Sequence, residues 1–297
     1  MPARLIDGKA IAERIQTETA SEIARLKAEH NLTPGLAVIL VGENPASVAY
    51  VSSKDKMCTR LGMHSLRLNL PASTTEGELL AKINDLNFDR TIHGILVQAP
   101  LPPHISEDVI FAGVDPTKDV DCFHPLNIGK LALGDDSGFF PCTPAGIQQL
   151  LIRSGVPIEG RHVVVLGRSR IVGRPVSLIL SQKAKNANAT VTVCHSRSAN
   201  LAEICRSADI LVAAIGVAHF VKAEMVREGA VVIDVGINRV EDKTAAKGYR
   251  LVGDVDFEPV SLKAGLITPV PGGVGPMTIA MLMHNTVRAA KLRHGIE

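Results

Sequence analysis

Two side chains suited to proton transfer stand four residues apart near the start of the chain. Tyr50 and Lys54 fall in a segment with helical spacing, so the phenol and the amine are expected on one helix face, within reach of one ligand. A lysine accepts protons near neutral pH only if burial or neighbouring charges lower its pKa. A solvated lysine beside a half-buried tyrosine is the alternative interpretation, but the chain has only two tyrosines and no tryptophan, which favours a function for this one.

A second group of residues is typical of a dinucleotide-binding turn. The apolar run 163–166 leads into Gly167, Arg168 and Ser169, and another glycine follows at 173. Glycine lets the backbone approach a pyrophosphate, the next helix offers its N-terminal N–H groups, and Arg168 can meet a 2′-phosphate. The two glycines do not have the G-x-G-x-x-G spacing, so a β-to-α turn without a ligand stays open as an alternative.

The next apolar run, 189–194, indicates which dinucleotide would bind. It ends at His195-Ser196-Arg197, where an NAD enzyme would place a carboxylate for the ribose 2′-hydroxyl. The missing carboxylate favours NADP. The order of motifs also argues against short-chain dehydrogenases, because their Tyr-x-x-x-Lys follows the glycine turn, whereas here it precedes that turn by more than a hundred residues.

Three further segments carry polar or constrained residues. Gln98 ends the apolar run 94–97, so its amide is expected at the carboxyl edge of a sheet, although it could also be a loop cap. Asp119 and Asp121 alternate, and an inward carboxylate in an extended piece would suit a ring with amino and imino donors; the alternative is a charged turn. Three prolines and three glycines in 268–278 predict a ligand-facing loop before a long helix.

The elements that must position these residues alternate between helix and strand. Helices are expected at 8–30, 46–61 and 75–87, and strands at 36–41, 65–70 and 94–98. After a region rich in Pro, Gly and Asp (100–144), a helix from 144 to 151 precedes strands at 162–167, 190–194, 210–215 and 230–235, and a long helix begins at 276. The predicted fold class is α/β with two domains, the second a doubly wound Rossmann-type parallel sheet, with a cleft between them.

Composition excludes several classes of function. The chain has 297 residues, of which 46% are hydrophobic and 21% charged, and a net charge of +2 without blocks of like charge, so neither nucleic acid nor a membrane surface is an expected partner. The five cysteines form no C-x-x-C pair, and the histidines lack metal-ligand spacing, so no disulfide framework or metal site is expected. No signal core or spanning segment is evident, and a reducing cytoplasm fits best.

Taken together, these segments resemble the bifunctional methylenetetrahydrofolate dehydrogenase/methenyltetrahydrofolate cyclohydrolase family over essentially the whole chain. The motifs that carry the likeness are, in chain order, Tyr50…Lys54, Val97-Gln98…Pro100-Leu101-Pro102, Lys118-Asp119-Val120-Asp121, Gly167-Arg168-Ser169…Ile171-Val172-Gly173…Pro175 and Pro271 to Thr278. The resemblance implies oxidation of 5,10-methylenetetrahydrofolate by NADP+ and hydrolysis of the methenyl product to 10-formyltetrahydrofolate in the same cleft, as part of one-carbon metabolism and purine biosynthesis.

The resemblance also implies residue roles. Lys54 would be the acid/base group of the hydrolytic step, Gln98 would tune it, Tyr50 would pack on the folate, and Asp121 would hold the pterin ring. The residues implied to bind NADP are Gly167, Arg168, Ser169, Ser196 and Ile237. Those implied to bind the substrate are Tyr50, Lys54, Val97, Gln98, Asp121, Pro271, Gly272, Gly273 and Thr278.

The likeness further implies domain limits and an assembly. Residues 1–143 with the C-terminal helix 276–297 would form the folate-binding catalytic domain, 144–275 would form the NADP-binding domain, and the protein would be a homodimer. The sequence departs from the family at Ala99, where leucine is usual, and at Cys122, where glycine is usual, so contacts from these two positions are in doubt.

Two other functions remain open from the sequence. One is an NADP-dependent dehydrogenase of similar two-domain design for a small hydroxy or amino acid, such as a shikimate-type enzyme. The other is a catalytically silent dinucleotide-binding regulator, in which Lys54 would be exposed with an ordinary pKa.

Overall fold

The computed structural model describes residues 2–242, 244 and 248–296, and within them the chain forms two compact units. Residues 13–142 and 279–297 form what we call the small-sheet unit, and residues 1–12 and 143–278 form the large-sheet unit. Met1 and Glu297, the outer limits of the predicted catalytic domain, lie outside the described residues. The grouping of residues 1–12 differs from the predicted limits, because the strand β1 (Arg4–Leu5) pairs with a strand of the large sheet.

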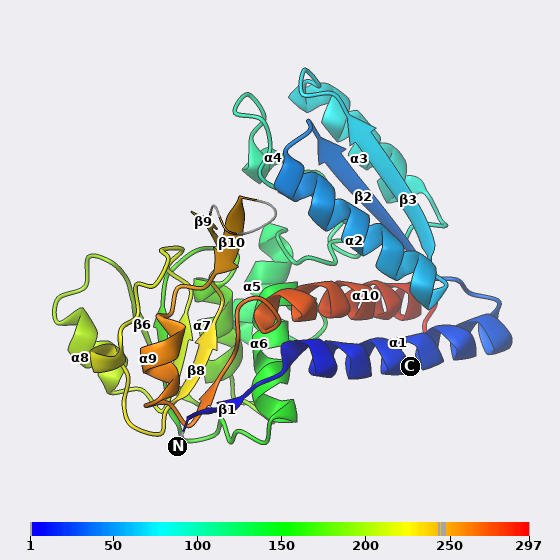
Figure 1. The fold of residues 1–297 in the computed structure, drawn as a ribbon. Coiled ribbons are helices and arrows are strands. Elements are labelled where there is room, and N and C mark those ends of the chain that lie inside the picture. Colours follow the sequence, from blue (N-terminus) through cyan, green and yellow to red (C-terminus); the bar gives the residue numbers. More distant parts are fainter. Residues whose placement is uncertain (1, 243, 245–247, 297) are drawn as a thin grey trace. The chain divides into compact units, whose positions relative to one another are not determined.

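The small-sheet unit is built on three parallel strands. They are β2 (Gly35–Val41), β3 (His64–Leu70) and β4 (Gly94–Val97), in the order β3-β2-β4. The central strand β2 is buried along its whole length, as expected for a nearly continuous apolar run in a parallel sheet. Figure 1 shows α2 (Pro45–Leu61) and α3 (Glu76–Phe88) on opposite faces of β2 and β3.

Helices account for most of the rest of this unit. They include α4 (Glu107–Gly113), α5 (Pro125–Leu133) and the longer parts of α1 (Gly8–His30) and α10 (Val274–Arg293). Helix α3 begins with a capping box in which Thr75 and Glu78 satisfy each other's free backbone N–H groups. Leu79, Ile83 and Leu86 of α3 are buried against the face of β2 that carries Ala37, Ile39 and Val41.

The large-sheet unit contains six parallel strands in the order β1-β11-β8-β7-β5-β6. Besides β1, the strands are β5 (His162–Leu166), β6 (Thr190–Cys194), β7 (Ile210–Ala213), β8 (Val231–Asp234) and β11 (Leu266–Ile267). From β5 the chain moves to one side to form β6 and then crosses to the other side to form β7. This reversal is the topological switch point at which doubly wound sheets bind their ligands, and the predicted Rossmann-type sheet is confirmed.

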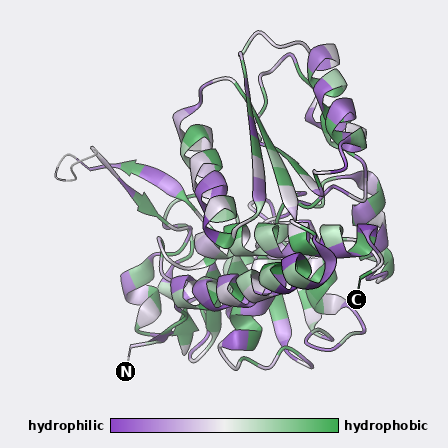
Figure 2. Cartoon of the chain, turned by 90° about the vertical axis from the view of Figure 1, so that its right-hand side faces the viewer, coloured by the Kyte–Doolittle hydropathy of each residue, from purple (hydrophilic) through white to green (hydrophobic). Residues whose placement is uncertain are grey.

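Short helices and a hairpin connect these strands. The helices are α6 (Cys142–Arg153), α7 (Gly173–Ser181), α8 (Leu201–Arg206), α9 (Phe257–Ser261) and the 3₁₀ turn η1 (Ala223–Met225). The antiparallel hairpin comprises β9 (Asn238–Glu241) and β10 (Tyr249–Val252). Figure 2 shows hydrophobic and hydrophilic residues alternating around the helices, the pattern of helices with one buried face.

The elements predicted from periodicity are present, with limits that agree within two residues. The region 100–144 differs from its prediction, because it contains the helices α4 and α5. Within the described part of the chain, none of the helices has the length and apolar composition needed to cross a membrane.

Candidate active site

Lys54 and Gln98 form a hydrogen-bonded pair at the carboxyl edge of the small sheet. Lys54 lies on the inner face of α2, is only 6% exposed, and donates from Nζ to Oε1 of Gln98 over 2.9 Å. Gln98 directly follows β4, and its Nε2 donates to the carbonyl of Ala99 over 2.7 Å. The second bond fixes which way the amide faces, so its oxygen is directed at the lysine. Gln98 is therefore more than the loop cap considered as the alternative.

Two more groups shape the electrostatics around Lys54. Burial lowers the pKa of the Lys54 amine, and the nearby Asp121 carboxylate acts in the opposite direction. Burial raises the pKa of Asp121, while the lysine lowers it. The buried Cys142 thiol, close to both, has a pKa held well above its ordinary value by the loss of water. Lys54, Gln98 and Asp121 thus belong to one poorly hydrated site, in which burial makes the protonated amine less stable than it is in water.

The segment around Asp121 is folded differently from the extended piece considered in the sequence. Residues 118–122 form successive turns, and Cys122 has a φ of +61°. Asp119 accepts backbone N–H bonds from Phe123 (3.0 Å) and His124 (2.9 Å), which anchors the start of α5. Asp119 therefore holds the turn, while Asp121 lies close enough to Lys54 for each charge to shift the pKa of the other.

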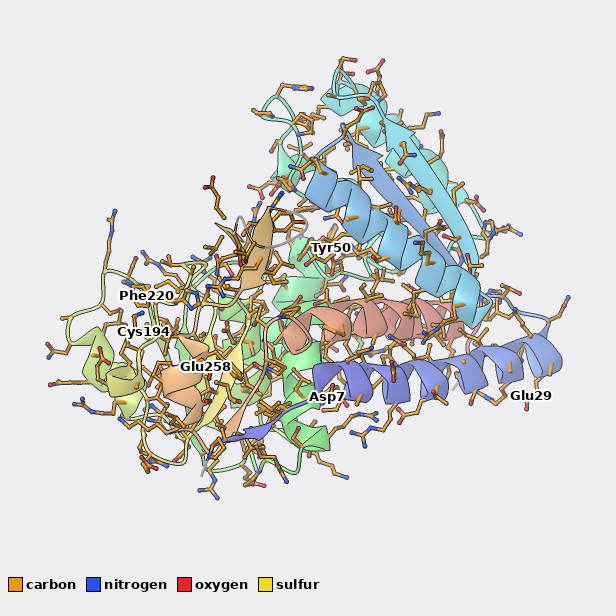
Figure 3. All side chains as sticks on the ribbon, viewed as in Figure 1. Asp7, Glu29, Tyr50, Cys194, Phe220 and Glu258 are labelled. Carbon is orange, nitrogen blue, oxygen red and sulfur yellow. The ribbon has the colours of Figure 1, made fainter. Side chains whose placement is uncertain are left out.

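Tyr50, which Figure 3 labels, lies on α2 four residues before Lys54, about one helical turn. It is 38% exposed, and the burial of the remainder raises the pKa of its phenol. The hydroxyl therefore stays protonated at neutral pH. A half-exposed aromatic ring beside a buried amine offers a flat apolar surface to a planar ligand.

The glycine turn after β5 has the close backbone approach that the sequence predicts. Gly167 has a φ of +130°, and a Cβ on it would lie 2.1 Å from the carbonyl oxygen of Ala214, so only glycine fits. Gly173, the first residue of α7, is equally restricted, since its Cβ would lie 2.3 Å from the carbonyl oxygen of Gly167. The Ser169 hydroxyl accepts N–H bonds from Val172 (3.2 Å) and Gly173 (3.3 Å) at the helix start.

The predicted 2′-phosphate residues are exposed at the carboxyl ends of adjacent strands. Arg168 follows β5 and Ser196 follows β6, and these strands are hydrogen-bonded neighbours. The N–H of Gly167 donates to the carbonyl of Cys194 over 2.8 Å, which ties the two loops together. The guanidinium of Arg168 and the hydroxyl of Ser196 suit the 2′-phosphate of NADP better than the 2′-hydroxyl of NAD.

The proline- and glycine-rich loop joins the cofactor residues within the large-sheet unit. Ile237, 47% exposed, approaches the loop, because its Cδ1 lies 3.8 Å from where a Cβ on Gly275 would be. Gly272 has a φ of +107°, and its carbonyl accepts the N–H of Lys9 over 3.0 Å. Thr278 is hydrogen-bonded to Thr143 through their hydroxyls at 2.8 Å.

Two buried carboxylates in this unit were not identified from the sequence. Asp234 ends β8 and Asp254 follows β10, and both accept several backbone N–H bonds. Burial raises the pKa of Asp234 to about 7. The signal in the sequence was a glycine within two residues of each carboxylate, in Asp234-Val235-Gly236 and in Gly253-Asp254. The backbone of Gly236 packs on Asp254 and that of Gly253 packs on Asp234, and so close an approach requires glycine. Across the ranges described, no cluster of three His, Cys, Asp or Glu side chains could hold a metal ion.

The fold, the glycine turn with its neighbouring strand ends, and the buried Lys54–Gln98 pair define a class of protein. A glycine turn at the switch point of a doubly wound sheet, with arginine and serine at the adjacent strand ends, is the arrangement of an NADP-binding dehydrogenase. The buried lysine bonded to an amide adds a group suited to proton transfer in a poorly hydrated site.

Comparison with known proteins identifies the family. The model of the tetrahydrofolate dehydrogenase/cyclohydrolase catalytic domain matches residues 6–121, and that of the NAD(P)-binding domain of the same family matches residues 141–294. The bifunctional protein FolD of Prosthecochloris aestuarii is 53% identical over 293 residues, covering 98% of this chain and 99% of the relative. The chain belongs to the tetrahydrofolate dehydrogenase/cyclohydrolase family.

Solved structures agree with that assignment. The bifunctional FolD enzyme of Campylobacter jejuni superposes with a TM-score of 0.92 at 49% identity, covering 98% of this chain and 99% of the other. The FolD enzyme of Trypanosoma brucei, solved with NADP cofactor and inhibitor, superposes with a TM-score of 0.94 at 41% identity, covering 99% of both chains. The resemblance, the two-domain α/β class and the NADP-dependent dehydrogenase and cyclohydrolase activities predicted from the sequence are confirmed. A shikimate-type enzyme is thereby excluded.

Proposed function

We propose that the buried amine of Lys54 is the proton acceptor when this enzyme hydrolyses 5,10-methenyltetrahydrofolate. The observation that carries the proposal is its 2.9 Å bond to the Gln98 amide oxygen in a poorly hydrated site. Burial lowers the pKa of the amine, and a cationic methenyl substrate nearby would lower it further. A neutral amine can then take a proton from the water that attacks the cation.

The dehydrogenase step precedes this hydrolysis. NADP+, when bound, accepts the hydride that leaves the methylene carbon of 5,10-methylenetetrahydrofolate. The protein's contribution is binding and orientation: the Gly167 turn and the first N–H groups of α7 suit the pyrophosphate, and Arg168 and Ser196 suit the 2′-phosphate. We assign Ser169 and Ile237 to the same cofactor site.

The remaining assignments concern the folate substrate. We assign Tyr50 to packing against the folate, Asp121 to the pterin ring, and Gln98 to the position and pKa of Lys54. We also assign Val97, which is buried at the end of β4 directly before Gln98, to the folate site. From the large-sheet unit we assign the loop residues Pro271, Gly272, Gly273 and Thr278 to the same substrate.

The setting of the enzyme is also part of the proposal. We infer a homodimer from the family likeness, which sedimentation of the purified protein tests directly. Five free, buried cysteines support a reducing compartment such as the cytoplasm. The near-neutral net charge of +2 gives no support to nucleic acid as a partner.

Substitution of the lysine tests the central assignment. Lys54→Met removes the amine but keeps the length of the side chain, and hydrolysis of preformed methenyltetrahydrofolate should fall by about 10³-fold, within the range that one general base contributes. The matched control is Lys56→Met, which alters an exposed lysine of the same helix and should hydrolyse at the wild-type rate. Hydrolysis by Lys54→Met within tenfold of wild type would refute the assignment.

A further inference from the structure

Asp254 holds two loops at the carboxyl edge of the large sheet. Its carboxylate is fully buried, and Oδ2 accepts the backbone N–H groups of Ile215 (2.7 Å) and Gly216 (2.8 Å) in the loop after β7. Oδ1 accepts from Nδ2 of Asn238 over 2.9 Å, at the start of β9. One carboxylate therefore connects the loop that follows β7 to the loop that follows β8.

Asp234 extends the same network. Its Oδ1 accepts the N–H groups of Gly236 (3.0 Å) and Asp254 (2.9 Å), and its Oδ2 accepts that of Val255 (3.0 Å). The N–H of Asp234 donates to the hydroxyl of Thr268 over 2.8 Å, just before the proline- and glycine-rich loop. Asp254 is thus itself held in place by a second buried carboxylate.

The backbone packs too closely on the two carboxylates to admit any side chain at Gly236 or Gly253. A Cβ on Gly236 would lie 2.2 Å from Oδ1 of Asp254, and a Cβ on Gly253 would lie 1.7 Å from Oδ2 of Asp234. Burying a carboxylate is costly unless its oxygens are satisfied by good hydrogen bonds. Apolar side chains in their place would leave the N–H groups of both loops without acceptors, so the two carboxylates tie the geometry of the loops to their stability.

The anchored loops each present an exposed apolar side chain. Val217, 49% exposed, directly follows the anchored residues Ile215 and Gly216. Ile237, 47% exposed, lies between Gly236 and Asn238, both of which the carboxylates restrain. The loop after β7 is also the one whose Ala214 carbonyl packs on Gly167 in the phosphate turn. Exposed aliphatic side chains on a restrained backbone are suited to contact a planar ring.

We propose that Asp254 is a positioning residue of the dehydrogenase reaction, which fixes Val217 and Ile237 as two apolar contacts for the rings of the bound dinucleotide. The inference rests on the proposed cofactor site and adds Val217 to it. Asp254 touches neither substrate nor cofactor, so it acts through the backbone N–H groups and the Asn238 amide that it holds.

The test uses Asp254→Asn in the full-length enzyme. The amide keeps an acceptor for the two backbone N–H groups but carries no negative charge, and its own NH₂ is paired only if the Asn238 amide turns its oxygen toward it. We expect kcat/KM for NADP+ in the dehydrogenase reaction to fall about 30-fold, the effect of losing a hydrogen bond to a charged group. Hydrolysis of preformed methenyltetrahydrofolate should stay within twofold of wild type, because Lys54 and Gln98 belong to the small-sheet unit and the Asp254 carboxylate bonds the loops after β7 and β8, not the 271–278 loop assigned to the folate.

A reciprocal variant separates positioning from a general loss of folding. In Asp254→Asn/Asn238→Asp the new amide donates to a carboxylate at 238 and still accepts the two backbone N–H groups, so the network regains a charged partner. We expect the dehydrogenase kcat/KM to return to within about threefold of wild type, since hydrogen bonds to a charged group are stronger than those between neutral groups. The matched control is Asp256→Asn, a carboxylate two residues away that pairs with Lys222 at 3.0 Å and should leave both reactions unchanged.

Three outcomes would overturn the inference: wild-type dehydrogenase kinetics in Asp254→Asn, an equal loss of both reactions, or no recovery in the reciprocal variant. If Asp254→Asn does not fold, Asn238→Ala and Val217→Ser test the inference instead. Asn238→Ala removes one hydrogen bond to Asp254, and Val217→Ser removes one of the two exposed apolar side chains. Both should raise the KM for NADP+ several-fold, and wild-type values in both would refute the inference. A failure of the proposed function would look different from a failure of this inference, because the wild-type enzyme itself would then lack the dehydrogenase reaction.

Discussion

Lys54 donates its hydrogen bond to an amide oxygen, and this choice of partner affects its protonation. A carboxylate at the position of Gln98 would stabilise the ammonium, whereas a neutral amide orients the amine without adding charge. The nearby Asp121 carboxylate acts against burial but does not outweigh it, so the pKa of the amine stays lowered. The site is thus arranged to hold a lysine that can lose and regain a proton.

The charge at position 98 provides the first test at this scale. Gln98→Glu puts a carboxylate 2.9 Å from the amine and should raise the pKa of Lys54, because the protonated form gains an opposite charge. The acid limb of the pH–rate profile for methenyl hydrolysis should move up by at least about one pH unit, with a rate at pH 7 about tenfold lower. Gln98→Met, which adds no charge, should not move that limb upward. An unmoved limb in Gln98→Glu would contradict a neutral lysine as the base.

Cys122 occupies a backbone conformation that favours glycine. At a φ of +61°, a residue with a Cβ carries a conformational cost of about 1–2 kcal/mol that glycine avoids. Cys122→Ala and Cys122→Gly both remove the buried thiol, so their difference isolates the backbone.

We expect Cys122→Gly to have a free energy of unfolding about 1 kcal/mol higher than Cys122→Ala in urea titrations. At Cys58, inside α2, the order should reverse, because glycine is there the poorer helix former. The same order at both positions would show that the backbone at 122 is not strained.

At the scale of the elements, periodicity predicted the regular structure well and the short segments poorly. The run 163–166 was long and β-branched enough to predict β5, and the spacing in 8–30 predicted α1. Helix α5 was missed because it has only nine residues, although Pro125 at its start and Gly134 after its end, with a φ of +73°, are standard helix limits. The strands β1 and β11 have two residues each, too few to show any period.

A histidine directly before β4 should make the small-sheet unit sensitive to acid. His93 is buried, its Nδ1 accepts the N–H of Gly35 over 3.0 Å, and burial lowers its pKa from 6.5 to about 4. Between those two values the unfolded chain binds a proton that the folded chain does not, so stability is complete above about pH 6.5 and falls as the pH decreases.

Urea titrations at pH 7 and pH 5 measure this effect. His93 should account for a loss of about 2 kcal/mol in the free energy of unfolding between them. In His93→Asn, whose amide oxygen can accept the Gly35 N–H but does not titrate, that loss should disappear. His64→Asn changes an exposed residue on β3 of the same sheet and should leave the wild-type pH dependence of stability unchanged. An unchanged slope in His93→Asn would show that the imidazole is not the acid-sensitive group.

At the scale of the whole molecule, the residues assigned to the two reactions belong to different units. Lys54, Gln98 and Asp121 come together in the small-sheet unit, and the glycine turn and its neighbouring strand ends come together in the large-sheet unit. The sequence revealed both groups because each uses residue types tied to a chemistry. Asp234 and Asp254 could not be predicted from the sequence, because they accept backbone N–H groups from loops that are distant in the chain. Such contacts produce no characteristic residue spacing.

The most direct test of the account is a time course of the methenyl intermediate in the purified enzyme, supplied with 5,10-methylenetetrahydrofolate and either NADP+ or NAD+. With NADP+, the absorbance of methenyltetrahydrofolate should rise as NADPH forms and then fall as 10-formyltetrahydrofolate accumulates. With NAD+ the rise should be much slower, because NAD+ lacks the 2′-phosphate that we propose Arg168 and Ser196 bind. In Lys54→Met, any methenyl intermediate that forms should persist. An enzyme that forms no methenyl intermediate with NADP+, or a Lys54→Met variant that clears it at the wild-type rate, would contradict the account.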